Sequence, residues 1–338
     1  MSPLLKNKDW SSVAVIGDGS WATALIRIMT ENPIKVKWWV RERENVKYIR
    51  RFGYNPDYLT GVSIPKRRVK ANHKIEKVVD SVEYVIVAVP AAYAKAALDQ
   101  LPGNAFDGKI VVTAVKGMIP DENLLVTDYI QKRFKVKTEN LAIISGPCHA
   151  EEVAMGRHSY LTIGSENLVL ADRVAKLFAC RFVNVACLED LQGIEYAAVM
   201  KNIVALASGI THSLNYGDNF QAVLVSNAMQ EIRYFLDHIC PKERDLSQSA
   251  YLGDLLVTAY SQFSRNRTFG NMIGRGYTIK SAMMEMKMVA EGYYAVNSIY
   301  KMVEANDLDM PICKAVYNIL YERITPTIEI DILKGRFK

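Results

Sequence analysis

The chain has 338 residues, enough for two domains of ordinary size that each bury a core. Half of the residues are hydrophobic and 23% are charged, which is typical of a globular protein and excludes a disordered chain. The net charge of +6 suits an anionic small molecule as well as nucleic acid, so charge alone excludes neither partner.

The cysteines and the lengths of the apolar runs indicate the cellular compartment of the protein. The cysteines are odd in number and form no C-x-x-C pair, which argues against a disulfide framework or a zinc site and favours a reducing environment. The first twelve residues lack the apolar core of a signal peptide, and no run approaches the roughly 18 apolar residues of a membrane span. We therefore predict a cytoplasmic protein without a metal site or integral membrane association.

The first predicted unit is a strand, a glycine turn and a helix. The apolar run 13–16 is followed by Gly17-Asp18-Gly19-Ser20-Trp21-Ala22 and by a helical pattern over 23–31. This order and spacing match the dinucleotide-binding fingerprint G-x-G-x-x-G/A. Gly17 makes the tight turn, Gly19 lets a pyrophosphate approach the backbone, and Ala22 allows close helix packing. The helix N-terminus then faces the phosphates. A purely structural turn is the alternative.

The second predicted strand, 35–40, ends in Arg41-Glu42-Arg43. In such folds the end of this strand meets the adenosine ribose, and two arginines suit the 2′-phosphate of NADP, while Glu42 leaves NAD open. Neighbouring residues of an extended segment face opposite sides, so we expect Arg41 rather than Glu42 to line the site. We predict NADP or NAD as cofactor, with NADPH used at least as well as NADH. The alternative is a solvated charged loop.

Further apolar strands are predicted at 82–89, 110–115 and 141–144, with two shorter ones at 160–164 and 181–185. Continuous apolar strands separated by helical segments indicate a mostly parallel sheet covered on both faces. Ligands of such sheets bind at the carboxyl ends of the strands. The glycine loop, Arg41, Pro90, Lys116 and Gly146 should therefore share one edge.

The alternation of strands and helices stops near residue 190. The helical patterns that follow cover 191–209, 220–240, 252–264, 279–288, 291–305 and 312–324. The predicted fold is thus α/β, with an N-terminal Rossmann-type dinucleotide-binding domain (1–189) and a C-terminal all-helical substrate and catalytic domain (190–338).

One lysine interrupts the first of these helices. The segment 195–209 is apolar on nearly every face and should be buried, with Gly209 as its stop. Burial disfavours an ammonium group, so Lys201 should have a lowered pKa and could exchange a proton near neutral pH. Alternatively its stem follows apolar surface and its amine reaches water or a structural carboxylate.

A second group of polar residues follows in the helical domain. Asp254 and Thr258 are four residues apart and share a helix face. Soon afterwards come Ser264-Arg265-Asn266-Arg267 and the glycines at 270, 274 and 276. A hydroxyl, an arginine and an amide beside a glycine-rich turn could hold a phosphate; an exposed basic turn is the alternative.

With these residues in view, the chain resembles the bacterial-type NAD(P)-dependent glycerol-3-phosphate dehydrogenase family from Val13 to about Tyr321. The resemblance rests on motifs in the family's order: Gly17 to Ala24, Val115-Lys116-Gly117, Ser145-Gly146-Pro147 with Ala150 and Glu152, Lys201-Asn202, Gly217-Asp218-Asn219, Leu252-Gly253-Asp254, Ser264 to Gly270, and Glu291-Gly292. The Ser-Arg-Asn-Arg-x-Phe-Gly run is the most specific of them.

The resemblance implies reduction of dihydroxyacetone phosphate to sn-glycerol 3-phosphate, a phospholipid precursor, with a small phosphate ester and no nucleic acid as partner. It implies Lys201 as the residue that donates and accepts the proton. The implied substrate residues are Lys116, Gly146, Cys148, Asp254, Ser264, Arg265 and Asn266. The implied cofactor residues are Gly17, Gly19, Ser20, Trp21, Arg41, Arg43, Lys116, Ala150, Arg265 and Glu291. Both a monomer and a homodimer stay open.

Two places depart from the family pattern. Cys148 and His149 replace a hydroxyl or amide followed by an aromatic, and Ala197-Ala198 replaces a glycine pair before the lysine. A β-hydroxyacid dehydrogenase would share the domain plan, but the 264–267 segment favours a phosphate over a simple carboxylate. A regulatory protein that senses NAD(P) would not need Lys201 and Asp254.

Overall fold

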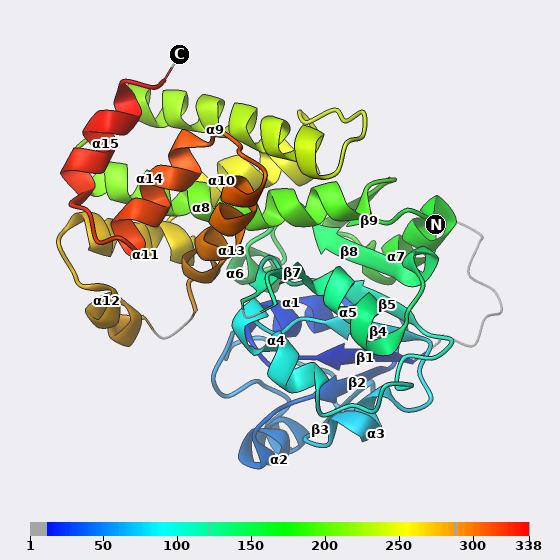
Figure 1. Cartoon of the computed structure of the whole chain (residues 1–338). Helices are drawn as coiled ribbons and strands as arrows, with labels where there is room; N and C mark the ends of the chain where they lie inside the picture. Colours follow the sequence, from blue (N-terminus) through cyan, green and yellow to red (C-terminus); the bar gives the residue numbers. More distant parts are fainter. Residues whose placement is uncertain (1–11, 121, 287–288, 338) are drawn as a thin grey trace.

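The computed structural model describes residues 12–120, 122–286 and 289–337. The N-terminal part contains an eight-stranded sheet with the order β10-β9-β8-β5-β4-β1-β2-β3 (Figure 1). The strands are β1 (Val13–Ile16), β2 (Val36–Trp39), β3 (Val69–Asn72), β4 (Tyr84–Val87), β5 (Ile110–Thr113), β8 (Leu141–Ser145), β9 (Ser159–Gly164) and β10 (Val183–Leu188). The described pairs are parallel except β8 with β9, so the prediction of a mostly parallel sheet is confirmed.

Helices cover both faces of this sheet, as the apolar strands require. Val85 and Val87 of β4 belong to one buried cluster, whereas Tyr84 and Ile86 belong to the other. Alternate residues of a strand point to opposite faces, so a strand buried on both sides has no polar position. The covering helices are α1 (Ser20–Met29), α2 (Arg43–Phe52), α3 (Ile75–Val79), α4 (Ala91–Leu98), α5 (Val126–Phe134), α6 (Ala150–Ala154) and α7 (Leu168–Phe178).

Helix α8 (Leu191–Ser213) begins the C-terminal part and lies among the later helices (Figure 1). It is buried almost throughout, as its apolar sequence predicts. The other elements are α9 (Asp218–Ile239), a π-helical turn (Ser249–Gly253), α10 (Asp254–Tyr260), α11 (Arg265–Gly274), α12 (Ile279–Glu285), α13 (Glu291–Ala305), α14 (Pro311–Leu320) and α15 (Pro326–Lys334).

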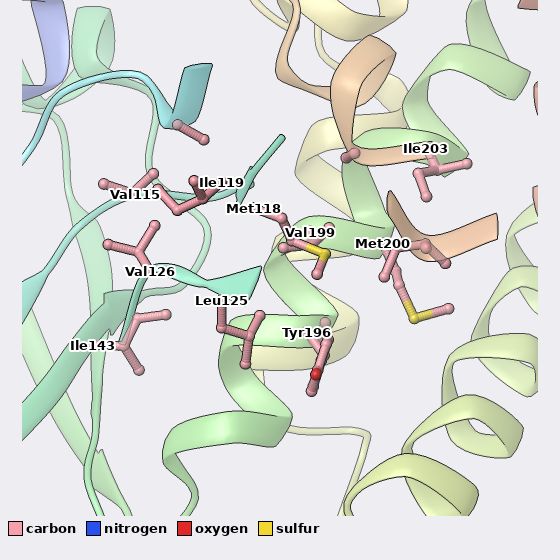
Figure 2. Close-up of a cluster of buried hydrophobic side chains, with 14 of the residues drawn as sticks. Val115, Met118, Ile119, Leu125, Val126, Ile143, Tyr196, Val199, Met200 and Ile203 are labelled. Carbon is pink, nitrogen blue, oxygen red and sulfur yellow. The ribbon is translucent and has the colours of Figure 1, made fainter. Parts of the chain in front are cut away.

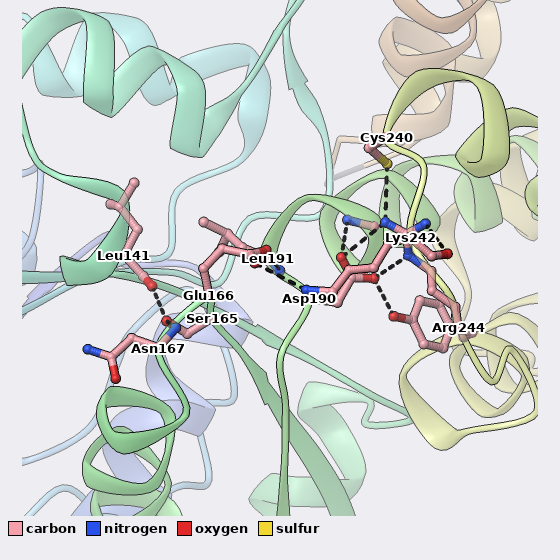
Figure 3. A network of polar contacts seen from close by, with 11 residues as sticks. Leu141, Ser165, Glu166, Asn167, Asp190, Leu191, Cys240, Lys242 and Arg244 are labelled. Carbon is pink, nitrogen blue, oxygen red and sulfur yellow. Dashed lines mark hydrogen bonds and ion pairs between the residues drawn. The ribbon is translucent and has the colours of Figure 1, made fainter.

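A polar network fixes the N-terminus of α8 (Figure 3). The Asp190 carboxylate accepts the Gly193 amide at 3.0 Å and the Arg244 Nε at 2.5 Å, and the Tyr251 hydroxyl donates to it at 2.6 Å. Glu166 accepts the Leu191 amide at 3.0 Å. These bonds satisfy amide groups that a helix start leaves without partners and set the axis of α8.

Further along, α8 packs against the segment between β5 and α5. Figure 2 shows Leu125 beside Tyr196, and Met118 beside Val199. The two short strands β6 (Met118–Ile119) and β7 (Leu124–Leu125) belong to this segment. The buried cluster that contains these residues runs from the sheet into the helical part. One buried core thus includes residues on both sides of residue 190, and no boundary between two separate cores is seen there among the described residues. The domain division at 189/190 stays a prediction.

Three sequence expectations about the helices are wrong. Gly209 does not end α8, which continues to Ser213. The pattern 252–264 is divided into the π-helical turn, α10 and a loop. The glycines at 270, 274 and 276 do not form the expected glycine-rich turn: most of the segment is α11, whose Gly270 lies against the backbone of Leu206. The glycines here permit close contact of two helices. From the local sequence alone, a glycine at a helix contact looks the same as a glycine that ends a helix.

This close contact predicts a stability effect. A Cβ at Gly209 would overlap the carbonyl oxygen of Arg267, and it would lie 2.7 Å from the Asn271 nitrogen. We expect Gly209→Ala to lower the free energy of unfolding by about 1–3 kcal/mol through overpacking, although alanine favours helix. Urea unfolding measures the change. The control is Gly61→Ala, whose Cβ would have no atom within 4 Å other than those of its chain neighbours. Equal stability of the two variants would contradict the expectation.

Candidate active site

The glycine loop lies at the carboxyl end of β1. Gly17 has φ +128°, and a Cβ there would lie 2.5 Å from the Ala88 oxygen, so only glycine fits this turn. Gly19 is the N-cap of α1, and the space around its missing Cβ is open. The first intrahelical bond is from Thr23 to Gly19, which leaves the amides of residues 20–22 facing outward. This arrangement fits a pyrophosphate.

Three unpaired polar atoms point to a polar ligand in the adjoining cavity. Trp21 Nε1, His149 Nε2 and Glu291 Oε2 are buried and have no hydrogen-bond partner among the described residues. All three residues line one cavity between the sheet edge and the helical part. Buried polar groups in proteins are nearly always paired, so these atoms fit a cofactor and substrate that complete the site.

Arg41 and Arg43 are exposed and lie outside the lining of this cavity. The Arg41 amide donates to Asp18 at 3.0 Å, which places Arg41 next to the loop. The expectation that Arg41 and Glu42 face opposite sides is wrong, since Arg41 Nε donates to Glu42 at 3.2 Å. Residues 41 and 42 form a bend and the N-cap of α2 rather than an extended strand, so strand alternation does not apply.

Asp254 is the centre of the buried polar group. Its carboxylate accepts hydrogen bonds from Lys201 Nζ, from Lys116 Nζ at 2.9 Å and from Ser145 Oγ at 3.2 Å. The exposed fraction of the side chain is 2% for Asp254, 6% for Lys201 and 18% for Lys116. Two lysines from different parts of the fold thus share one carboxylate in the cavity wall.

One carboxylate cannot fully compensate two ammonium groups. Burial lowers the pKa of Lys201; Asp254 opposes this shift and Lys116 adds to it. Burial also acts to lower the pKa of Lys116, but the raising contributions, of which the Asp254 carboxylate makes the largest, together outweigh it and the pKa of Lys116 is raised. Lys116 is the more exposed lysine and also donates to the Gly146 oxygen at 3.2 Å. Lys116 therefore keeps its charge, and Lys201 is the group that can exchange a proton.

The pKa of Asp254 moves the other way. Burial by itself would raise it, but the charges of Lys116 and Lys201 lower it below the ordinary value. Asp254 therefore stays ionised at neutral pH. Its position is fixed locally, because Asp254 is the first residue of α10, and the Thr258 hydroxyl donates to its carbonyl at 2.6 Å. The prediction that Asp254 and Thr258 share one helix face is confirmed.

Contacts between the two parts of the chain close the cavity. Arg265 Nη2 donates to Ser20 Oγ at 2.5 Å. Glu291 Oε1 accepts the Ala91 amide at 3.0 Å, and burial raises the pKa of Glu291. Asn202 Nδ2 donates to the Lys116 oxygen at 2.7 Å, which joins α8 to the loop after β5. The cofactor edge and the helical part therefore form one site.

The sequence matches the family model for the N-terminus of NAD-dependent glycerol-3-phosphate dehydrogenase over residues 12–171, and the model for its C-terminus over 190–331. The chain belongs to this glycerol-3-phosphate dehydrogenase family. The recognition made from the sequence motifs is thereby confirmed, as are the NAD(P)-dependent dehydrogenase class and the predicted fold.

Individual relatives of this dehydrogenase agree over their whole length. The glycerol-3-phosphate dehydrogenases [NAD(P)+] of Lysinibacillus sphaericus and an Exiguobacterium species are 31% and 33% identical to it, each match covering 96% of both chains. The crystal structure of the Coxiella burnetii glycerol-3-phosphate dehydrogenase superposes with a TM-score of 0.86 at 26% identity, covering 96% of this chain and 98% of that one. None of the described helices of the dehydrogenase is long and apolar enough to cross a membrane.

The loop after β8 contains the departures from the family pattern. Gly146 has φ +105°, and a Cβ there would lie 2.6 Å from the Tyr160 oxygen. The Cys148 thiol donates to the Gly146 oxygen at 3.3 Å, and burial raises the pKa of Cys148 to about 11. In the dehydrogenase this thiol is therefore protonated at neutral pH.

His149 and Ala150 follow at the start of α6. Burial lowers the pKa of His149, with further lowering from Lys201 and Lys116, so its ring is neutral. The ring contacts that of Phe263 with centroids 5.9 Å apart. Ala150 is the first residue of α6, and its exposed fraction is 7%. Its small side chain leaves the cavity open here.

The structure brings most of the predicted site residues together. Those that line the cavity are Gly19, Ser20, Trp21, Lys116, Cys148, Ala150, Lys201, Asp254, Ser264, Arg265, Asn266 and Glu291. Gly17 and Gly146 lie beneath it in the loops, and Arg41 and Arg43 lie outside. Sequence reasoning did not assign Ser145, Asn202 or His149. Asn202 had a signal, as a polar residue in an apolar helix beside Lys201.

Proposed function

We propose that this dehydrogenase reduces dihydroxyacetone phosphate to sn-glycerol 3-phosphate reversibly, with Lys201 as the proton donor and acceptor. The observation that supports this role most strongly is the buried Lys201–Asp254–Lys116 arrangement in the cavity wall at the sheet edge. A lysine with a lowered pKa beside an ionised carboxylate suits proton exchange with a substrate oxygen near neutral pH.

The fit of the glycine loop and α1 to a dinucleotide supports the proposed cofactor residues. Gly17, Gly19 and the amides at the start of α1 would hold the pyrophosphate, and Ser20, Trp21, Lys116, Ala150, Arg265 and Glu291 would line the rest of its site. When bound, the nicotinamide supplies or accepts a hydride. Ala88, Val89 and Pro90 form the apolar wall that would exclude water from that transfer.

Residues of the protein stabilise the charge on the substrate oxygen and exchange a proton with it. As the carbonyl becomes an alcohol, negative charge grows on its oxygen, and the ammonium of Lys116 stabilises that charge. Lys201 gives the oxygen a proton, and in the reverse direction its neutral amine takes one back. Asp254 holds both amines in place and limits the fall in the pKa of Lys201. Asn202 positions Lys116 through its carbonyl.

The substrate phosphate would bind at the start of α11. Ser264 is its N-cap and Asn266 is buried, with its Oδ1 accepting the Gly292 amide at 2.9 Å. The Asn266 amide group and the Arg265 guanidinium then remain as donors toward a phosphate, which prefers paired charged donors. Cys148, Gly146, Lys116 and Asp254 complete the proposed substrate contacts.

The direct test is the oxidation of NADPH or NADH, followed by absorbance, with dihydroxyacetone phosphate as substrate. We expect turnover with this ketone and with no simple β-keto acid, because Arg265 and Asn266 match a phosphate rather than a carboxylate chain. Turnover with a β-keto acid alone would favour a β-hydroxyacid dehydrogenase instead.

Arg265→Ala tests the phosphate contact. Losing one charged hydrogen-bonding partner costs about 1.5–3 kcal/mol, so we expect the Michaelis constant for dihydroxyacetone phosphate to rise by roughly 10- to 100-fold. Unphosphorylated dihydroxyacetone, assayed on the same variant, should be much less affected. Equal losses with both ketones would show instead that Arg265 acts on the cofactor or through its bond to Ser20.

We further propose that the enzyme uses NADPH at least as well as NADH. Arg41 lies beside the glycine loop, and a 2′-phosphate could replace its exposed pairing with Glu42. Arg41→Ala should raise the Michaelis constant for NADPH by about tenfold, ~1.4 kcal/mol, and that for NADH less. Lys47→Ala, which removes an exposed cation of α2, is the control. NADH preference in the parent enzyme, unchanged by Arg41→Ala, would overturn the proposal.

The cellular setting is also a proposal. The five cysteines are free, which suits a reducing compartment, and we place the enzyme in the cytoplasm, where it would supply glycerol 3-phosphate for phospholipid synthesis. A homodimer stays a prediction, for which sedimentation equilibrium is the measurement.

A further inference from the structure

The positive charge of the chain is concentrated in one segment. Residues 41–77 contain eleven lysines and arginines against four aspartates and glutamates, a net charge of +7. The whole chain has a net charge of +6, so the remaining residues together have a net charge of −1. Thirty-seven residues therefore account for the entire net positive charge of the chain. This charge is larger than that of the two arginines, Arg41 and Arg43, that were proposed to meet the cofactor.

This segment forms one end of the molecule. It contains α2, β3 and the first part of α3, and β3 is an outer strand of the sheet. Figure 1 shows these elements together at the lower end, away from α9, α14 and α15. An outer strand leaves backbone groups unpaired on one side, and the exposed Lys70 on β3 is the kind of residue that prevents pairing with another strand.

Contacts within the segment gather its cations. Lys66 Nζ donates to the Arg51 oxygen at 3.0 Å, and Arg50 donates twice to the Ala71 oxygen, at 2.9 and 2.7 Å. Burial lowers the pKa of His73, and nearby cations that include Arg50, Lys74 and Lys77 lower it further. We call the exposed residues Arg50, Arg51, Lys66, Lys70, Lys74 and Lys77 the basic face.

The charge of the basic face is not neutralised by the protein. Among the described residues, no ion pair joins any of its six cations to a carboxylate. Two of the segment's acids have other partners, since Glu44 pairs with Lys47 and Asp57 accepts from Asn45. An excess of one charge on neighbouring surface elements attracts an extended anionic partner.

Exposed aromatic rings accompany these charges. Tyr48, Phe52 and Tyr54 are 42%, 48% and 37% exposed. Tyr48 and Phe52 are four apart on α2 with ring centroids 4.7 Å apart, and the Arg51 guanidinium lies 5.0 Å from the Phe52 ring. Aromatic rings next to lysines and arginines on a surface helix are typical of segments that enter the headgroup region of a bilayer.

We propose that the basic face, together with Tyr48 and Phe52, binds the surface of an anionic phospholipid membrane. The cations meet the lipid phosphates and the rings enter the headgroup layer. Nucleic acid is the less favoured partner, because Tyr48 and Phe52 pack against each other at 48° and do not offer free parallel faces for stacking bases. With no acyl anchor or spanning helix involved, binding is reversible and weakens with salt.

Sedimentation of the full chain with vesicles tests this proposal. One set contains phosphatidylcholine only and the other replaces one third of it with phosphatidylglycerol, both with saturating NADPH so that anion binding at the cofactor site is constant. At low salt, we expect the ratio of bound to free protein to be at least tenfold higher with the anionic vesicles. In high salt, this difference between the two vesicle types should disappear. Equal binding to the two vesicle types would overturn the proposal.

Charge reversals identify the surface. The triple variant Arg51→Glu, Lys70→Glu, Lys74→Glu should lose the preference for anionic vesicles at least tenfold and keep its turnover without vesicles. The matched control reverses three exposed lysines of the helical part, Lys280, Lys301 and Lys314, with the same change in net charge. If the control lost as much binding as the triple variant, the effect would come from net charge and the basic face would have no special role.

Two further arms separate the rings and the rival partner. Tyr48→Ser with Phe52→Ser leaves the charge unchanged and should reduce vesicle binding several-fold; unchanged binding would remove the rings from the proposal. Fluorescence anisotropy with a labelled RNA and a labelled DNA duplex at the same salt should show weaker binding than the anionic vesicles. Tighter binding to nucleic acid than to vesicles would overturn the proposal in favour of that partner.

Discussion

Replacing Lys201 by methionine is expected to lower turnover with dihydroxyacetone phosphate by about 10²- to 10⁴-fold, the range typical of losing a general acid. Methionine keeps the apolar stem of this 6% exposed side chain and removes only the amine. Cofactor affinity should change little, because Lys201 bonds to Asp254 and to no residue of the glycine loop. Stopped-flow measurement of the reduction step, with cofactor titrated by fluorescence, separates the two effects.

The pH dependence of the parent enzyme gives an independent check on Lys201. Its pKa is lowered from an ordinary value of about 10.4, so the ammonium is lost well below that pH. Reduction needs the protonated amine and should fall as pH rises through the lowered pKa, whereas oxidation needs the neutral amine and should rise. In Lys201→Met both of these pH responses should disappear.

Lys301→Met, an exposed lysine of α13, is the control and should behave as the parent enzyme. Lys201→Ala should give the same loss as Lys201→Met, with some added loss of stability from the cavity it leaves. Near-normal turnover in both Lys201 variants would remove this lysine from the mechanism and leave it a structural partner of Asp254.

Asp254→Asn should have the second large effect, on stability as well as on turnover. The change keeps the shape of the side chain but leaves the buried Lys201 and the partly buried Lys116 without a counter-charge. Removing one partner of a buried ion pair costs about 3–5 kcal/mol of folding free energy. Chemical denaturation measures this loss, and Ser145→Ala, which removes only the 3.2 Å hydroxyl contact, should cost about 1 kcal/mol.

The sign of the pH effect in Asp254→Asn follows from the carboxylate's role. Asp254 raises the pKa of Lys201 against burial, so without it that pKa falls further. The loss of reduction activity should move to lower pH than in the parent enzyme. Between the lowered pKa of folded Lys201 and the ordinary pKa of about 10.4, the unfolded variant binds more protons than the folded one. The variant's stability should therefore rise with pH over this interval, which is wider than in the parent enzyme. A shift of the activity profile to higher pH would contradict the assigned role of Asp254.

Several features were determined by sequence alone because they depend on local geometry. Residues 17–22 predict the cofactor loop, since only certain spacings of glycines allow the turn and the close approach of a phosphate. The apolar β-branched runs predict buried strands, because a strand covered on both faces has no polar position. The uninterrupted apolar pattern around Lys201 predicts burial of that lysine and the direction of its pKa shift.

Other features needed the tertiary structure because they depend on which distant residues meet. That Asp254 contacts Lys201 and Lys116 together, across 53 and 138 residues of sequence, follows from how α10 packs on α8 and beside the β5 loop. The same holds for Ser145, because the Ser145-Gly146-Pro147 motif does not indicate that this hydroxyl meets Asp254. Gly209 illustrates the reason most plainly. Its local preference is for a helix end, but α11 packs so closely against α8 at this residue that no side chain would fit. Tertiary packing therefore outweighs the local preference.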